Sequence, residues 1–167
     1  MSIQYTEKGY GLHLAIAAAG HRLEQRDGAW IASDDAAVQA IIDGYTLDQA
    51  KAYKRALVSA HGTALRNRVI GAYSPGEMAS WPIKLAEARA FAGGAPADQC
   101  PMLAAEAAAR GVAVADLAGK VGTNATTFAG LEATIAGVEG KHRDAIAACA
   151  TFDAVEGYDY SVGWPEV

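Results

Sequence analysis

The stretch that decides the fold is residues 114–149, which read VADLAGKVGTNATTFAGLEATIAGVEGKHRDAIAAC. Residues of one face recur along it at alternating spacings of four and three, which is the heptad pattern of a helix that packs along another helix. The positions of this seam are Leu117, Val121, Asn124, Phe128, Leu131, Ile135, Val138, His142, Ala145 and Cys149. The pattern predicts one long helix that needs a helical partner.

Packing has to stabilise this helix, because it contains glycines at 119, 122, 130, 137 and 140. Each glycine lowers intrinsic helix stability by roughly 1 kcal/mol relative to alanine. The partner is either the preceding long helix folded back antiparallel or a second copy of the chain. In both cases Asp at Phe128 or Leu131 is expected to lower the melting temperature strongly.

The preceding long helix is expected over residues 46–72. Thr46 and Gln49 form a capping box at its start, and Leu47, Leu57 and Leu65 lie on one face. A second capping box, Ser74 with Glu77, begins a helix with Trp81 on its apolar side, and a short helix is expected over residues 101–110.

The first 45 residues predict a small mixed unit. Short strands are expected at 3–6, 21–25 and 29–33, and helices at 10–19 and 36–42. Asp27-Gly28 is a strong hairpin signal, because a tight turn needs positive φ angles. The expected fold is mainly α: a small α+β unit with a hairpin at 1–45, a bundle or antiparallel hairpin of long helices at 46–156, and an aromatic tail at 157–167.

The tail contains three aromatic residues and no helical period. Aromatic side chains at this density are seldom left free in water. They either pack back on the helices or dock another protein. The aromatic residues that the sequence singles out as partner-binding candidates are Trp30, Trp81, Tyr158, Tyr160 and Trp164.

Charge argues against a general nucleic-acid binder, since the net charge of the 167 residues is −5. Residues 46–73 nevertheless carry five basic groups and one acidic group. Either these basic groups face carboxylates elsewhere in the fold, or they meet an acidic partner such as nucleic acid in a regulator. The basic residues concerned are Lys51, Lys54, Arg55, Arg66 and Arg68.

Motifs for catalysis, cofactors and metals are missing. Gly119-Lys120 lacks the rest of a phosphate-binding loop, and the sequence contains no nucleophile elbow and no zinc-protease motif. The four histidines are scattered, and Cys149 lies two helical turns from His142, too far for a nucleophile and its base. The sequence therefore predicts no catalytic residue, no cofactor, no metal and no enzyme activity.

No apolar run approaches the roughly 20 residues of a membrane span, and residues 1–8 do not have the pattern of a secretory signal. We therefore expect the chain to fold in the cytoplasm without a membrane partner. Cys100 and Cys149 are then expected to be reduced.

Two stretches resemble small proteins encoded beside tail-fibre genes in phages and prophages. They are residues 28–45, GAWIASDDAAVQAIIDGY, and residues 77–88, EMASWPIKLAEA, followed by alanine-rich helices and the ending YDYSVGWP at 158–165. The chain thus resembles phage tail-fibre assembly chaperones and small tail proteins that carry a domain of unknown function.

This resemblance implies a protein that binds a tail-fibre or other tail protein. It implies work in the cytoplasm of the bacterial host during phage assembly, or a permanent place in the tail of the virion. Self-association through the helix from Val114 is a further expectation. The resemblance identifies no active residue.

Overall fold

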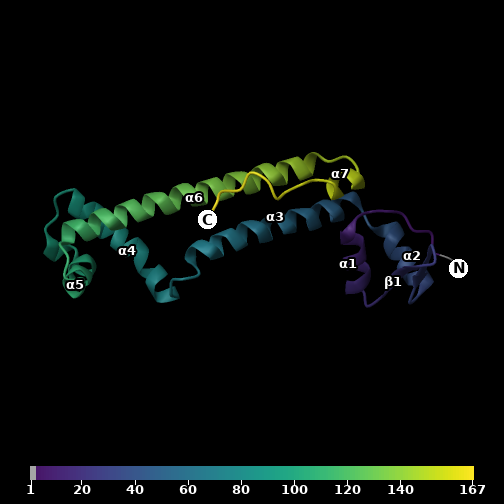
Figure 1. Ribbon diagram of the computed structural model, residues 1–167, viewed down its shortest axis with the longest axis horizontal. Coiled ribbons are helices and arrows are strands. Elements are labelled where there is room, and N and C mark those ends of the chain that lie inside the picture. Colours follow the sequence, from purple (N-terminus) through teal and green to yellow (C-terminus); the bar gives the residue numbers. More distant parts are fainter. Residues whose placement is uncertain (1–2) are drawn as a thin grey trace. The chain divides into compact units, whose positions relative to one another are not determined.

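The computed structural model describes residues 3–167, and Figure 1 shows its elements. Helix α1 (Tyr10–Ala18), the antiparallel hairpin of β1 (Leu23–Arg26) and β2 (Ala29–Ala32), and helix α2 (Asp35–Gly44) come first. The remaining elements are α3 (Leu47–Ile70), α4 (Pro75–Ala92), the 3-10 turn η1 (Ala97–Gln99), α5 (Pro101–Arg110), α6 (Val114–Ala148) and α7 (Phe152–Glu156). The expected fold class, mainly α with a small α+β unit at the start, is confirmed.

The element boundaries follow the local signals of the sequence. Asp27 and Gly28 adopt φ angles of 51° and 81°, which the tight turn between β1 and β2 requires. Gln49 N–H donates to the Thr46 hydroxyl, and Thr46 N–H donates to the Gln49 side chain, so the expected capping box begins α3. The Glu77 N–H likewise donates to the Ser74 hydroxyl at the start of α4.

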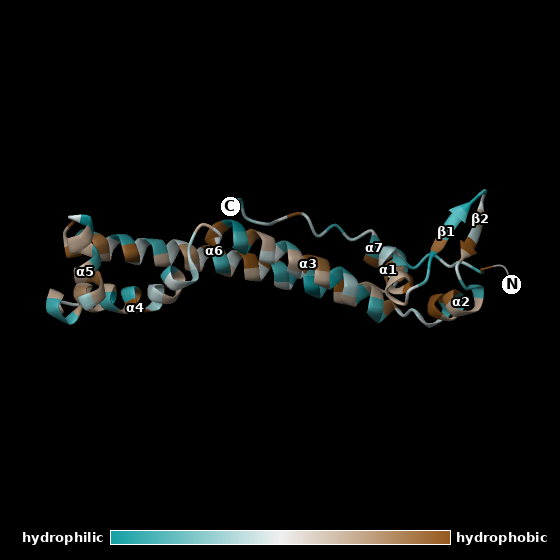
Figure 2. Cartoon of the chain, turned by 90° about the horizontal axis from the view of Figure 1, so that it is seen from below, coloured by the Kyte–Doolittle hydropathy of each residue, from teal (hydrophilic) through white to brown (hydrophobic). Residues whose placement is uncertain are grey.

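The strand expected at residues 3–6 does not form. Gln4 N–H donates to the side-chain oxygen of Gln39, and the Gln39 amide donates back to the Gln4 carbonyl. A glutamine side chain on α2 thus takes the place of a neighbouring strand for this segment. Val38 and Ile42 of α2 are buried in the core of unit 1. Strand β1 is mostly exposed and largely hydrophilic, as its teal colour in Figure 2 shows.

The described chain forms two compact units that differ from the segments expected at 1–45, 46–156 and 157–167. Unit 1 contains the residues up to Thr63 together with Gly137–Trp164, and unit 2 contains Ala64–Ala136 with Pro165–Val167. The N-terminal elements share a core with the chain's C-terminal part, because Val155 and Phe152 pack with Leu12, Ile16 and Ile42. A boundary at residue 45 would cut through this core.

In unit 1, α3 and α6 run antiparallel. The Lys51 ammonium donates to the Ala147 carbonyl at 2.8 Å, and the Arg143 guanidinium donates to the Ser59 hydroxyl at 2.8 Å. Residue numbers therefore rise on one helix as they fall on the other. Of the two partners left open for the seam of α6, the folded-back helix is the one present.

Three basic residues of α3, Lys51, Lys54 and Arg55, bind carbonyl oxygens of the chain and not the expected carboxylates. Lys51 binds the last turn of α6, and Lys54 donates to the Glu156 carbonyl at the end of α7 at 2.7 Å. A cation at the carbonyl end of a helix offsets the negative end of the helix dipole. Arg55 donates within α3, to the Lys51 carbonyl.

In unit 2, the last turns of α3 pair with α6 through Arg66. Its guanidinium binds both carboxylate oxygens of Glu132, with an Nη2 to Oε1 distance of 2.7 Å. These hydrogen bonds lower the pKa of Glu132. The core of this unit lies further along, where Ala88 of α4, Leu103 of α5 and Leu117 of α6 are buried together.

Gly11 lies where α1 approaches two tyrosines of unit 1. A Cβ atom there would collide with the Tyr45 hydroxyl and lie 3.0 Å from the Tyr53 ring. Gly11→Ala is therefore expected to lower the free energy of unfolding by roughly 1–3 kcal/mol, as overpacking does. Urea denaturation checks this value.

The matched control is Gly137→Ala, on α6 of the same unit, where a Cβ atom meets nothing within 4 Å. This substitution is expected to stabilise the chain by roughly 0.5–1 kcal/mol, because alanine favours the helix. Equal effects of the two substitutions would show that the approach at Gly11 is not tight.

Candidate functional site

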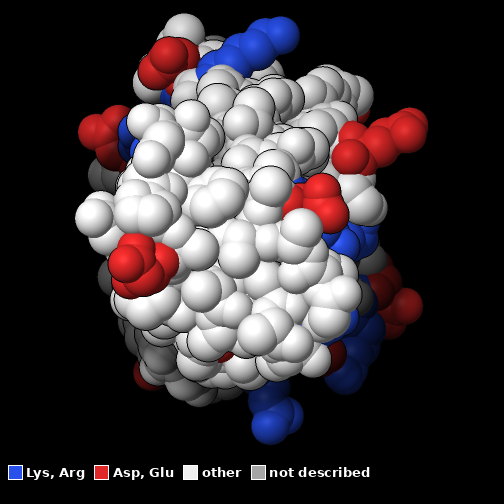
Figure 3. Space-filling model, turned by 90° about the vertical axis from the view of Figure 1, so that its left-hand side faces the viewer, with Lys and Arg blue, Asp and Glu red and all other residues white. Residues whose placement is uncertain are grey.

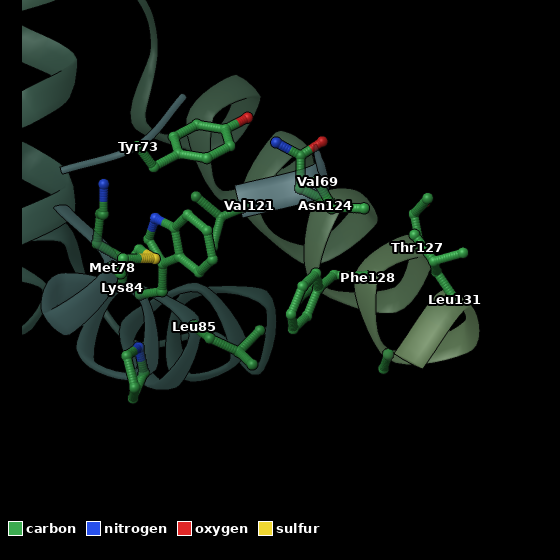
Figure 4. A pocket seen from close by; sticks show the side chains of 14 residues that line it. Val69, Tyr73, Met78, Lys84, Leu85, Val121, Asn124, Thr127, Phe128 and Leu131 are labelled. Atoms are coloured by element: carbon green, nitrogen blue, oxygen red, sulfur yellow. The ribbon is translucent and has the colours of Figure 1, made fainter. Parts of the chain in front are cut away.

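Unit 2 contains an open groove between α4 and α6, closed at one end by the last residues of α3. Its volume is about 640 Å³, within the range of about 300–1,000 Å³ typical of binding pockets. Figure 4 shows Met78, Lys84 and Leu85 of α4 on one wall and Asn124, Phe128 and Leu131 of α6 on the other.

Three aromatic rings form the centre of the groove. Trp81 meets Tyr73 edge to face with 5.1 Å between ring centroids, and it meets Phe128 in the same way at 6.0 Å. Tyr73 and Phe128 remain 45% and 40% exposed. We call Tyr73, Trp81 and Phe128 the aromatic trio. Exposed aromatic groups of this kind are typical of protein-binding surfaces.

The charged side chain that lines the groove is paired inside unit 2. The Lys84 ammonium, which lines the groove, lies 3.1 Å from Glu106, and Arg110 binds the same carboxylate at 2.8 Å. Hydrogen bonds from Lys84 and then Arg110 lower the pKa of Glu106. A carboxylate held ionised in this way is poorly suited to donate a proton near neutral pH.

Glu87, a carboxylate of α4, caps α5. Its two oxygens accept from the Met102 and Leu103 N–H groups at 3.3 and 2.8 Å. This is the anion position that a helix N-terminus favours. Glu87 and Glu106 thus have separate structural roles and do not form an acid/base pair.

Residues 3–167 contain no group of three or more His, Cys, Asp or Glu side chains placed to hold a metal ion. In the same described part of the chain, no helix is both long and apolar enough to cross a bilayer.

Known proteins give no further guide to this groove. No protein-family model, curated protein or solved structure matches the chain.

The five candidate residues lie in three places. Trp81 belongs to the groove of unit 2. Trp30 packs inside unit 1, stacked on Tyr5 at 4.0 Å between centroids and 5.9 Å from the ring of His13. Tyr158, Tyr160 and Trp164 lie together in unit 1, where the tail packs on α3 and α6.

Rings of the tail cover two histidines of the long helices. Trp164 lies 4.8 Å from the ring of His61 and 5.4 Å from the ring of His142. The Lys54 ammonium lies over the Tyr160 ring at 5.6 Å, and the Trp164 N–H donates to the Tyr160 carbonyl at 2.7 Å. Of the two roles left open for the tail, packing is the one present.

His142 holds the tail through both ring nitrogens. Nε2 lies 3.0 Å from the Val162 carbonyl, and Nδ1 lies 2.7 Å from the Tyr158 hydroxyl. A carbonyl only accepts, so Nε2 carries the proton, and in the neutral ring Nδ1 accepts from Tyr158. The imidazole is 3% exposed and acts as a clamp with no free nitrogen for proton transfer.

His142→Ala is expected to free the tail without unfolding the helices. Two hydrogen bonds of about 1 kcal/mol each are lost, so amide hydrogen exchange in residues 158–164 should accelerate roughly 10–30-fold. The control is Lys141→Ala, at an exposed position one residue earlier. Unchanged exchange in the His142 variant would mean that other contacts hold the tail.

The sequence did not single out Tyr73, it placed Leu85 on the apolar face that also holds Trp81, and it assigned Phe128 to a buried seam. A usable signal was present in the helix lengths. Helix α3 has 24 residues and α6 has 35, so α3 is too short to cover the whole seam. Asn124, a polar residue within the seam, marks the uncovered part.

A second surface of unit 2, which Figure 3 faces, is largely uncharged in its middle, and most of the charged side chains in that view lie toward its edge. Near it lie α5 and the turn after it, with exposed Ala105, Ala108, Ala109 and Val112. Small side chains offer little area to anchor a partner. The groove with the aromatic trio is the stronger candidate.

Proposed function

We propose that the chain is a non-catalytic assembly factor that binds a phage tail-fibre protein through the groove of unit 2. The observation that carries this proposal is the partly exposed aromatic trio, which lies in a groove whose one charged lining residue among those described, Lys84, is already paired. Such a site suits burial of another protein's apolar surface and offers no group for chemistry.

The choice of partner comes from the resemblance of residues 28–45, 77–88 and 158–165 to proteins encoded beside tail-fibre genes. A fibre chaperone has to shield apolar surface of the fibre until the fibre assembles. On this proposal the chain acts in the cytoplasm of the bacterial host during phage assembly.

A nucleic-acid-binding regulator has less support. Lys51 and Lys54 bind helix-end carbonyls, and Arg66 binds Glu132. Releasing these groups to bind phosphates would leave the helix ends and Glu132 without their partners.

Co-expression tests the proposal. The C-terminal part of the tail-fibre protein encoded beside this chain is produced alone and with it. We expect the fragment to be insoluble alone, soluble with the chain, and to elute with it as one complex in size-exclusion chromatography. If neither the fibre nor another tail protein binds, the proposal fails.

The same complex distinguishes a chaperone from a tail component. A chaperone is absent from mature particles or confined to the fibre tip, whereas a component is present in stoichiometric amounts. Quantitative mass spectrometry of purified particles therefore decides between them.

A further inference from the structure

In unit 2 the seam of α6 is covered at both ends and open between them. Leu117 at one end is 3% exposed, and Ile135 at the other is 1% exposed. Between them Asn124 is exposed and Phe128 keeps 40% of its surface open. The groove lies along this open part.

Helices cover the two closed ends. Near Ile135 the neighbouring helix is α3, which is joined to α6 by the Arg66–Glu132 pair one turn away and ends at Ile70. At Leu117 the cover is the core formed with α4 and α5. The open part thus continues an interface that is helix against helix on both sides.

Spacing within the open part repeats that of the closed parts. Val121, Asn124, Phe128 and Leu131 follow one another at intervals of three, four and three. This spacing forms the holes that receive side chains of a facing helix. We infer that the groove binds an amphipathic α-helix of the partner protein, which supplies the missing cover over the α6 seam.

An extended strand fits less well. Strand addition needs a sheet edge with unused backbone N–H and C=O groups. The walls of the groove belong to α4 and α6, whose backbone groups are used within the helices except at Pro82, which leaves the Met78 carbonyl without a helical donor. One free carbonyl is not a sheet edge. The antiparallel hairpin, which has such edges, lies in unit 1 and not at the groove.

The shortage of charged residues in the groove indicates which side chains the partner helix inserts. Among the described residues that line the groove, Lys84 is the only charged one, and Glu106 already pairs with it. A charge inserted by the partner would lose water without gaining a counter-charge. The partner helix therefore presents large apolar residues at i, i+3 or i+4, and i+7.

This inference rests on the proposed function for the identity of the partner but is tested without it. A displayed library of random 20-residue peptides is selected on the full chain, with counter-selection on the Phe128→Asp variant. Ala133→Asp is the matched control, because Ala133 is an exposed residue of α6 outside the groove. Melting curves of both variants verify that they fold.

We expect enriched peptides to share apolar residues at the helical spacing, to become helical on binding, and to bind the control variant but not Phe128→Asp. Enrichment of strand-like alternation, enrichment of proline-rich sequences, or no enrichment would each overturn the inference. So would a dimer of the chain, seen by sedimentation, that Phe128→Asp dissociates and Ala133→Asp does not. In that case a second copy fills the groove.

The two proposals fail separately. If the fibre fragment binds but no helical peptides are enriched, the assembly function stands and the inference of a partner helix fails. If helical peptides are enriched but no fibre complex forms, the groove binds a helix and the tail-fibre protein is not its partner.

Discussion

Replacing Ile135 by Asp is expected to lower the free energy of unfolding by about 4 kcal/mol, among the largest effects of a single substitution. The side chain is 1% exposed on α6, so the new carboxylate is buried without a partner. For a chain of this size, that loss corresponds to a fall of roughly 8–16 °C in melting temperature. Calorimetry measures it directly.

Two other Asp substitutions on α6 provide comparisons for Ile135→Asp. Ala133→Asp, at an exposed position, should lower stability by no more than about 1 kcal/mol, the loss of helix propensity. The heptad pattern alone predicted a strong fall for Phe128→Asp, but Phe128 is 40% exposed in the groove, so its effect should lie closer to this control than to Ile135→Asp. A melt of Phe128→Asp as low as that of Ile135→Asp would show that the groove is closed in solution.

The second large effect concerns the complex. Trp81→Ala is expected to weaken binding of the tail-fibre fragment roughly 30–1,000-fold, as loss of a central aromatic anchor costs about 2–4 kcal/mol. Trp81 is the ring that contacts both other members of the trio. Isothermal titration with the purified fragment provides the dissociation constant.

The matched control for Trp81 is Trp30→Phe. Trp30 stacks on Tyr5 within unit 1, so this variant should bind the fragment within about twofold of the unchanged chain. Equal weakening by both substitutions would point to a general loss of structure and not to an anchor in the groove.

Local signals in the sequence predicted much of the fold. The capping residues Thr46 and Ser74 and the Asp27-Gly28 turn act over a few residues, so their effects follow from chemistry alone. The heptad spacing predicted α6 and its need for a helical partner for the same reason.

The aromatic site was harder to predict, because exposure depends on which segments meet. Phe128 occupies the same kind of seam position as Ile135, yet only Ile135 is covered, since α3 ends at Ile70. Trp30 and Trp164 are of the residue type common at docking sites, but in the structure their rings pack against Tyr5 and His142 of the same chain. Spacing along a helix does not contain this information.

The partners of the charged residues could not be predicted from the sequence either. The sequence predicted carboxylate partners for Lys51 and Lys54. In the structure they bind carbonyl oxygens of residues about a hundred positions later in the chain. Only the fold places the ends of α6 and α7 beside them.

Hydrogen exchange of the free chain and of its complex with the fibre fragment tests the role of the groove most directly. Binding in the groove should protect amides in residues 69–85 and 121–131, which contain its lining residues. The hairpin at residues 23–32 and the tail at 158–164 should exchange as in the free chain. Protection confined to the hairpin or the tail, with residues 69–85 and 121–131 unchanged, would contradict the proposal that the groove binds the partner.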